Sequence, residues 1–465
     1  MKITDASIKI ILDSRGRETL EAELKGDGFV VKASVPAGKS RGKHEAFVLE
    51  PKIALEKFQE IKPQILSREF KNQEDFDNFL IELDGTHSTS SGQAPKSNLG
   101  GNLILALSLA FARLKAKSEG LELFQYINKI FQIPNSSSLP SSQLDGQELQ
   151  RAGGFQIPKP IFNVINGGAH SGYPHKSASN QHQSASLEFQ EFQIIPEVKD
   201  FGMALGLGQE FYEKLGQFLE KKFGKENVVL GDEAGFSAPF QNNEEAIEIL
   251  AELIEKYKYP LRIGLDVAAS QFYQQQGFYL IGEKKYSAEE LKDFYLRLIE
   301  SYNILSIEDP FQEEVFDDFS LLFYKLLNQQ TALPYREVPF NNKEVIKSKI
   351  KNKEILMITD DLTTTNPERL KTAIDKKSGN AILIKPNQIG TLTETLKVVK
   401  MAYENNWQAV VSHRSGETMD DFIADLAVGI GAWGIKAGAP AKPERMAKYQ
   451  RLLKIFNEFL PQKKQ

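Results

Sequence analysis

Hydrophobic and polar residues alternate along the first part of the chain, as they do in half-buried β-strands. Residues 3 to 36 contain three such stretches, ITDASIKIIL, ETLEAELKG and FVVKASVP. They are rich in alternating or β-branched residues and are separated by Arg-Gly and Gly-Asp-Gly turns. This pattern predicts a three-stranded meander.

The period changes to a helical one between residues 53 and 131. One helical face carries apolar residues at Leu99, Leu103, Ala106, Leu107, Ala110, Phe111 and Leu114. A stretch dense in Ser, Gly and Pro follows, IPNSSSLPSSQLDGQELQRAGGFQIP, which is typical of an exposed linker. We predict an N-terminal α+β domain at residues 1–140, a linker at 141–157 and a second domain at 158–465.

The second domain alternates short apolar runs with amphipathic stretches. The runs end in charged residues, as in NVVLGDE, RIGLD, ILSIED, EILMITDD, AILIK, AVVSHR and GIK. This is the rhythm of repeated strand and helix units. A doubly wound open sheet would also alternate, but no Gly-x-Gly-x-x-Gly follows a strand here. We therefore favour an α/β class with an eightfold β/α barrel, in which strand ends collect on one rim.

Composition narrows the class of protein further. The chain has 465 residues, 41% of them apolar and 26% charged, with a net charge of -5 and no cysteine. Disulfides, thiolate metal sites and cysteine nucleophiles are excluded, and no nucleic-acid partner is implied. The first residues lack the regions of a signal peptide, and no apolar run reaches a membrane span of roughly 18 residues. The default location is cytoplasmic.

Three acids that each follow an apolar run are candidates for metal ligands: Asp266, Glu308 and Asp360. Converging carboxylates on a barrel rim would form an oxygen-only site suited to a hard divalent cation such as magnesium. A single acid after a strand is more often a helix N-cap, but three in successive units favour a metal. The neighbouring Asp309 and Asp361 fit caps or groups that support the ligands.

Basic residues also stand at run ends. Lys385 ends AILIK and Lys436 ends GIK. Each is either a base or cation beside a metal or simply a rim lysine. His413 and Arg414, next to Ser415, supply donors that suit a phosphate or carboxylate. By themselves, the strand-end acids Glu233 and Glu191 would more often be surface acids, yet they are also available for proton transfer.

Several longer motifs resemble those of enolases and occur in the same order. They are SRG, LGDEAGF, GLDVAASQFY, SIEDPF, DDLTTTNP, IKPNQIGTLTET, SHRSGET and IKAGAP. The resemblance runs from Ile8 to Leu453. It implies a small N-terminal domain on a modified barrel whose second strand runs antiparallel. It also implies magnesium-dependent conversion of 2-phosphoglycerate into phosphoenolpyruvate, with two magnesium ions per site, the second arriving with substrate.

The resemblance assigns roles to individual residues. It implies that Asp266, Glu308 and Asp360 hold the first magnesium, and that Ser40, in a mobile loop, ligates the second. Lys385 then matches the base that removes the α-proton, and Glu233, assisted by Glu191, the acid that protonates the leaving hydroxyl. The remaining residues resemble groups that contact substrate: His170, Gln190, His413, Arg414, Ser415 and Lys436. A homodimer or higher homo-oligomer is implied too, and a surface or secreted fraction beside the cytoplasmic one stays open.

The chain departs from the enolase pattern at several places. The mobile loop reads PAGKSRGKHEA where PSGASTG is usual, which adds Lys39, Arg41 and Lys43. Ala234 stands where a second glycine is commoner, which matters if that backbone needs a positive φ. Insertions at 171–186 and 313–352 have no function that we can infer, and the first should be mobile. The same three acids would also suit a sugar-acid dehydratase or a racemase. A non-catalytic scaffold is the other alternative, and such a protein should have lost the acids or Lys385.

Overall fold

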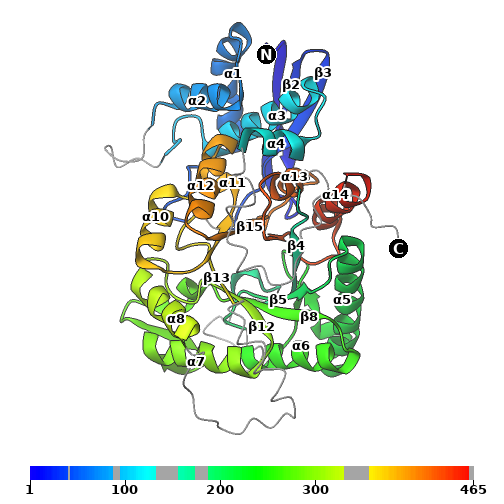
Figure 1. The fold of residues 1–465 in the computed structure, drawn as a ribbon, viewed down its shortest axis with the longest axis vertical. Helices are drawn as coiled ribbons and strands as arrows, with labels where there is room; N and C mark the ends of the chain where they lie inside the picture. The colour runs from blue at the N-terminus through cyan, green and yellow to red at the C-terminus, as the bar shows by residue number, and fades with distance from the viewer. Residues whose placement is uncertain (40–41, 87–94, 132–154, 173–186, 329–354, 460–465) are drawn as a thin grey trace.

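The N-terminal part of the chain is a three-stranded sheet packed against helices. The computed structural model describes residues 1–39, 42–86, 95–131, 155–172, 187–328 and 355–459. The strands β1 (Asp5–Leu12), β2 (Glu18–Gly26) and β3 (Phe29–Ser34) pair antiparallel in chain order. The helices are α1 (Pro51–Ser67), α2 (Gln73–Asp84), α3 (Gly101–Ser118) and α4 (Leu123–Phe131). The predicted meander and helical stretch are confirmed, and this part caps one end of the molecule (Figure 1).

Helix α3 is more deeply buried than its sequence pattern indicates. The pattern predicts one apolar face, but the structure buries 14 of its 18 residues, among them Asn102 and Ser108. The reason is tertiary: α3 packs on β2 and β3 and also contacts α2, α4, α11 and α12. A helix that is covered on every side shows no polar face to predict.

Within the described residues, eight strands close into a barrel in the second part of the chain. In chain order they are β4 (Lys159–Asn166), β5 (Glu191–Pro196), β8 (Leu261–Asp266), β12 (Ile304–Glu308), β13 (Leu356–Thr359), β14 (Ala381–Ile384), β15 (Gln408–Ser412) and β16 (Gly434–Lys436). Strand β16 pairs with β4 and completes the ring. The predicted barrel is confirmed.

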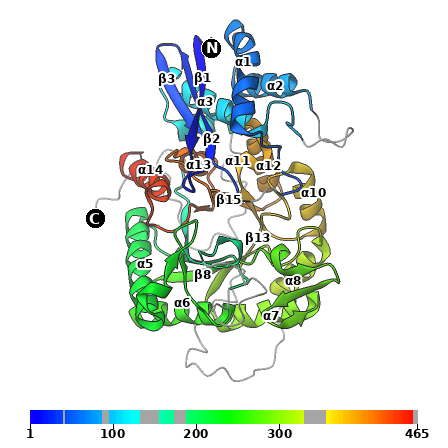
Figure 2. The ribbon, with the colours of Figure 1, turned by 180° about the vertical axis from the view of Figure 1, so that it is seen from behind.

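Helices surround this barrel on the outside, as Figures 1 and 2 show from opposite sides. They are α5 (Phe201–Phe223), α6 (Asn243–Tyr257), α7 (Ala288–Ser301), α8 (Phe316–Asn328), α10 (Pro367–Lys376), α11 (Pro386–Ile389), α12 (Leu392–Glu404), α13 (Phe422–Gly429) and α14 (Pro443–Phe459). Two small strand elements are attached to the barrel. The strands β6 (Val229–Leu230) and β7 (Phe236–Ser237) pair with each other beside β4, and a separate three-stranded sheet consists of β9 (Tyr273–Gln274), β10 (Phe278–Ile281) and β11 (Lys284–Tyr286).

The second barrel strand runs against its neighbours. Strand β5 pairs antiparallel with both β4 and β8, whereas the other neighbouring pairs of the ring are parallel. This is the direction that the resemblance implies. Periodicity alone is the same for both directions of a strand.

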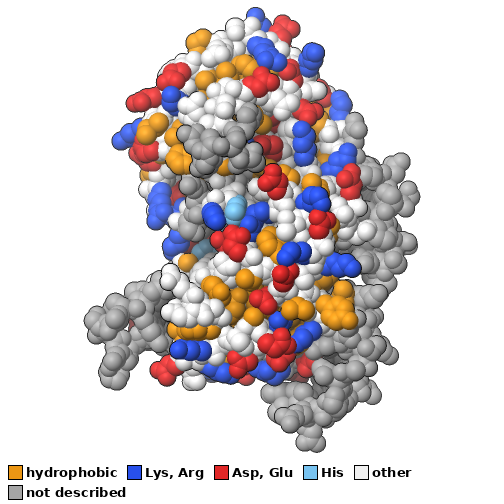
Figure 3. All heavy atoms as spheres, turned by 90° about the vertical axis from the view of Figure 1, so that its left-hand side faces the viewer, with side chains coloured by type: hydrophobic (Ala, Val, Ile, Leu, Met, Phe, Trp, Pro, Cys, Tyr) orange, Lys and Arg blue, Asp and Glu red, His pale blue; other side chains and the backbone are white. Residues whose placement is uncertain are grey.

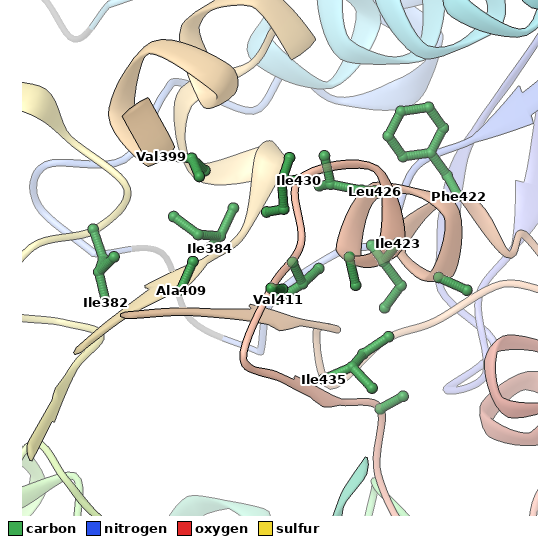
Figure 4. Packing of buried hydrophobic residues seen from close by; sticks show 14 of the residues in the cluster. Ile382, Ile384, Val399, Ala409, Val411, Phe422, Ile423, Leu426, Ile430 and Ile435 are labelled. Carbon is green, nitrogen blue, oxygen red and sulfur yellow. The ribbon is translucent and has the colours of Figure 1, made fainter. Parts of the chain in front are cut away.

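Alternate residues of the barrel strands pack into two different hydrophobic cores, one inside the barrel and one between the barrel and its helices. In β14, Ala381 and Leu383 face the barrel interior, where they pack with residues such as Leu305. Ile382 and Ile384 face outward into the layer under the helices, where Figure 4 shows them with side chains of α12 and α13. This period of two is the one expected of strands buried on both faces.

Two predicted segments lie outside the described residues for most of their length. They are the linker at 141–157 and the insertion at 171–186, so the domain boundaries and the mobility stay predictions. Most of the 313–352 insertion lies outside them as well. None of the helices that are described is long and apolar enough to cross a membrane.

Candidate active site

Three carboxylates lie side by side at one rim of the barrel because of the strand register. Asp266 ends β8 and Glu308 ends β12, and the two residues pair in the parallel ladder. Glu191 begins β5, but β5 runs the other way, so Glu191 pairs with Asp266 at the same level. All three are buried. The antiparallel strand therefore brings its first residue to the rim where its neighbours bring their last.

The ammonium of Lys436 lies between these carboxylates. Its Nζ lies 2.9 Å from Asp266 Oδ2, 3.0 Å from both carboxylate oxygens of Glu308 and 3.2 Å from Glu191 Oε2. Burial alone would lower the pKa of Lys436, but the three carboxylates raise it well above its usual value. Burial and the charge of Asp266 still raise the pKa of Glu308 well above its usual value. One ammonium is therefore too little positive charge for this cluster.

Asp360 and Lys385 form a second ion pair at the ends of the next two strands. Asp360 follows β13, Lys385 follows β14, and Lys385 Nζ donates to Asp360 Oδ2. Burial alone would lower the pKa of Lys385, but the charge of Asp360 raises it. Asp360 Oδ1 also accepts from Gln388 Nε2 at 3.2 Å, and its backbone N–H donates to Asp309 at 3.1 Å. The carboxylate is thus held in place, and Lys385 is an ammonium in this state.

Glu233 faces this cluster from a separate loop and is surrounded by donors. Asn163 Nδ2 donates to Glu233 Oε2 at 3.0 Å, and His413 Nε2 lies 3.2 Å from the same oxygen. His170 Nδ1 lies 3.5 Å from Glu233 Oε1 and 3.5 Å from Glu191 Oε1. Burial would raise the pKa of Glu233, but the two histidines lower it well below its usual value. Burial and the charge of Glu233 raise the pKa of Glu191, so a proton shared by the two acids rests on Glu191.

The loop that carries Glu233 is a tight turn between β6 and β7. Gly231 N donates to Gly235 O at 2.8 Å, and Ala234 N donates to Gly231 O at 3.1 Å. Ala234 has a φ of 68°, in the left-handed region. The missing glycine of the LGDEAGF motif therefore matters, because an L-residue is strained there. Other non-glycine residues with positive φ follow barrel strands: Ala268, Asp309, Thr364 and Thr365.

The predicted anion-binding residues meet the N-terminal part of the chain. Arg414 donates through both terminal nitrogens to the buried carboxylate of Glu45, at 2.9 and 3.2 Å, and to Asn387 Oδ1 at 3.0 Å. Ser415 Oγ accepts from Arg15 Nη1 at 3.0 Å. Where the two parts of the chain meet, Figure 3 shows basic and acidic side chains gathered with a histidine. Both parts of the chain therefore build this corner of the site.

The segment that leads into the predicted mobile loop also reaches the barrel. Arg15 Nη2 donates to the carbonyls of Ala37 and Gly38, at 2.9 and 3.2 Å. Lys39 Nζ donates to Ala169 O at 2.7 Å and to Asp232 Oδ2 at 3.0 Å. These contacts link the loop to the residues that precede His170 and Glu233. Ser40 and Arg41 themselves lie outside the described residues.

The donor set at the rim suits a hard divalent cation. The sequence-predicted ligands Asp266, Glu308 and Asp360 are all carboxylates, and Gln190 adds an amide that donates to Asp266 Oδ2 at 3.2 Å. In this structure two lysine ammoniums lie against the three acids. Among the described residues, two sets have ligand atoms within 4.8 Å of one another: His170, Glu191 and Glu233, and Asp309, Asp360 and Asp361. Oxygen ligands and the uncompensated charge at Glu308 suit a hard cation such as magnesium better than a metal that prefers thiolate or imidazole ligands.

Comparison with known proteins decides the family. A model of the "Enolase, N-terminal domain" matches residues 3–127, and one of the "Enolase, C-terminal TIM barrel domain" matches residues 154–354 and 333–464. The chain belongs to the enolase family. It is 37% identical to the enolases of Methanocaldococcus jannaschii and Methanopyrus kandleri, and 36% identical to that of Thermococcus gammatolerans. Each comparison covers 98% of this chain and 95% of the relative. Membership of the enolase family makes the chain a hydro-lyase, a phosphopyruvate hydratase.

The contacts of several residues at this enolase-family site could not be predicted from the sequence, although Arg15 and Gln388 lie within the motifs SRG and IKPNQIGTLTET. Glu45, Arg15 and Gln388 contact the site through partners far away in the chain. Arg445, in α14, is completely buried and donates to His413 Nδ1 at 2.5 Å. In the sequence it stands in PERMAKYQRLLK, where a charged residue is typical of a solvated helix face. Local patterns do not reveal contacts made across 28 residues or more.

Proposed function

We propose that the chain dehydrates 2-phosphoglycerate to phosphoenolpyruvate, reversibly and in dependence on magnesium held by Asp266, Glu308 and Asp360. The observation that carries this proposal is that Lys385 and Lys436 lie against buried acids, next to a pair of acids, Glu191 and Glu233, that His170 contacts from one nitrogen. A cation-rich side suits proton removal next to a carboxylate, and an acidic side suits loss of hydroxide. Ser40 as ligand of a second ion, the homodimer and the cytoplasmic location stay predictions.

Lys385 is the base in this proposal, and its ion pair with Asp360 must be broken before it can act. The lysine removes the α-proton only as a neutral amine, whereas its ion pair with Asp360 now favours the ammonium. Asp360, together with Asp266 and Glu308, would hold a divalent cation, which would supply positive charge next to the substrate carboxylate; Asp360 would then no longer hold Lys385 as an ammonium. Lys436 adds a fixed positive charge on the same side, where negative charge develops as the α-proton leaves.

Glu233 is the proposed acid for the leaving hydroxyl, with Glu191 as its partner. Hydroxide leaves poorly, so a proton must reach the hydroxyl as the carbon–oxygen bond breaks. The proton that rests on Glu191 lies close to Glu233 through His170, which contacts both acids at 3.5 Å. We propose that the two acids share this proton and that Glu233 presents it to the substrate. Arg414, Ser415 and His413 contact the substrate's charged groups.

One experiment separates the base from the acid. Lys385→Ala should abolish both turnover and exchange of the α-proton with solvent, because no enediolate forms without the base. Glu233→Gln should keep the exchange while elimination falls by about 10²- to 10⁴-fold, as for the loss of a general acid. Phosphoenolpyruvate absorbance follows turnover, and deuterium uptake by 2-phosphoglycerate follows exchange.

Two controls make this comparison decisive. Lys397 is an exposed lysine of α12 that pairs with Glu74. Lys397→Ala should leave both rates unchanged. Glu191→Gln should slow elimination as Glu233→Gln does if the two acids share one proton. Wild-type exchange in Lys385→Ala would refute the assignment of the base.

A further inference from the structure

Arg445 is a buried cation whose guanidinium donates hydrogen bonds to the loop that follows β15. It is the third residue of α14, and none of its surface is exposed. Its guanidinium donates to three backbone carbonyls: Arg414 O at 2.9 Å, Ser415 O at 2.7 Å and Asp232 O at 3.2 Å. Glu444 Oε1 lies 3.8 Å from Nε, so among the described residues no acid comes within hydrogen-bond distance. Its fourth contact is His413 Nδ1, at 2.5 Å.

This fourth contact fixes the proton on His413. A guanidinium only donates hydrogen bonds, so Nδ1 must accept and carries no proton. A neutral imidazole then carries its proton on Nε2. That nitrogen lies 3.2 Å from Glu233 Oε2. Arg445 therefore selects the tautomer that carries its proton on Nε2, the ring nitrogen that lies next to Glu233.

The charges around His413 agree with a neutral ring. Burial and the charge of Arg445 together lower the pKa of His413 to about 4, against the opposing effect of Glu233 and Glu417. The charge of Glu417 is itself engaged by Lys448 Nζ at 2.8 Å. His413 is therefore neutral at pH 7, with Arg445 on one nitrogen and Glu233 at the other.

The backbone around this trio is built for close approach. A Cβ on Gly438 would lie 2.9 Å from Glu233 O, 3.0 Å from Arg445 Cδ and 3.2 Å from His413 Cε1. Gly438 also has a φ of 85°, which glycine adopts without strain. The segment after β16 thus passes between the backbone of Glu233 and the side chains of Arg445 and His413 with no room for a larger residue, and it limits how far these two side chains can move.

We propose that Arg445 is a positioning residue for the dehydration: it holds His413 as the neutral Nε2–H tautomer, so that His413 orients the Glu233 carboxylate. The kinetic consequence rests on the proposed function, but the state of His413 does not. An imidazolium at this place would be a second acid beside Glu233, and the other tautomer would present a lone pair to a carboxylate. Arg445 excludes both.

The direct test reads the protonation of His413 by nitrogen-15 NMR of histidine-labelled enzyme, with His413→Gln used to assign its signal. In the wild type, Nε2 should carry the proton and Nδ1 should carry none from pH 8 to pH 5. In Arg445→Met, the pKa of His413 should rise toward its ordinary value near 6.5, because the donor and its charge are gone. At saturating substrate, kcat should fall about tenfold to a hundredfold with little change in KM. Arg445→Lys, which keeps a cation that only donates, should restore part of both.

Lys448→Met is the matched control. Lys448 lies one turn further along α14, is also buried, and donates to the carbonyls of Thr418 and Glu444 at 2.6 and 2.8 Å. Losing it removes a buried cation from the same helix and loop and frees the charge of Glu417, but Arg445 still donates to His413 Nδ1. The Nε2–H tautomer should therefore persist.

Three results would overturn the proposal. They are an Nδ1–H tautomer or imidazolium in the wild type at pH 7, an unchanged His413 in Arg445→Met, and loss of the Nε2–H tautomer at pH 7 in Lys448→Met. If Arg445→Met does not fold, the wild-type tautomer and Arg445→Lys decide alone. A wild type that holds the Nε2–H tautomer but does not dehydrate 2-phosphoglycerate would reject the proposed function and leave the assignment of His413 standing.

Discussion

Replacing Lys436 by methionine should destabilise the metal-free chain strongly, because three buried carboxylates lose their ammonium. The Nζ contacts with Asp266, Glu308 and Glu191 span 2.9 to 3.2 Å. Removing one partner of a buried ion pair costs about 3 to 5 kcal/mol, since the other charge is left without compensation. Here the partner is a cluster, so we expect the upper end of that range at pH 7. Magnesium should reduce the loss, because it restores positive charge to the same acids.

Urea unfolding of four proteins measures this effect: wild type, Lys436→Met, Glu308→Gln and the double variant, each with chelator and with magnesium. Glu308→Gln removes one of the stranded charges, so the double variant should be about 1 to 3 kcal/mol more stable than the sum of the single losses. Lys292→Met is the control. Lys292 is equally buried, but the side chains of its partners Glu289 and Asp318 are 62% and 26% exposed, so both carboxylates can return to water. The reasoning is refuted if Lys436→Met loses no more than Lys292→Met, or if the coupling stays within about 0.5 kcal/mol.

Three further outcomes are expected. Exhaustive chelation should abolish conversion of 2-phosphoglycerate, measured by phosphoenolpyruvate absorbance, and magnesium should restore it. Ala234→Gly should cost less stability in urea unfolding than Ala106→Gly in α3, because the φ of 68° at Ala234 already strains an L-residue by about 1 to 2 kcal/mol. Burial raises the pKa of Asp77 from 3.8 to about 6, so its contribution to stability is full below pH 3.8 and is lost as the pH rises through 6. Asp77→Asn should therefore remove a fall of about 2.4 kcal/mol in unfolding free energy between pH 4 and pH 7, measured by urea unfolding at both.

The fold was largely predictable because its signals are local. Alternation in residues 3 to 36 and apolar runs that end in charged residues each depend on neighbours within one element, so the meander and the barrel follow from the sequence. The same locality explains the failures. The pattern of α3 could not show that Asn102 and Ser108 are buried, because the elements that cover them are distant in the chain. The direction of β5 leaves no trace in its period, and only the family resemblance supplied it.

The candidate site divides in the same way. Residues at strand ends, such as Asp266 and Lys385, could be found because a charge after an apolar run is visible in the sequence. Glu45 and Arg445 could not, since their importance lies in what they touch: Arg414 in one case and His413 in the other. Charged residues in a loop or on a helix are usually solvated, so burial is the only sign that sets these two apart.

The cations of this site share one property that bears on catalysis: folding has already removed them from water. Lys436 and Lys385 lie against buried acids, and Arg414 lies against Glu45. Desolvating a cation costs several kcal/mol, and here the acids offset that cost before any substrate arrives. An anionic substrate then exchanges one set of partners for another instead of drawing hydrated charges into the barrel. Positive charge that is fixed in advance needs little reorganisation as negative charge develops, which is the condition under which it stabilises a transition state most. The acids around these lysines therefore have a second role beside the metal binding that we propose for them, because they also keep the cations in place until the substrate binds.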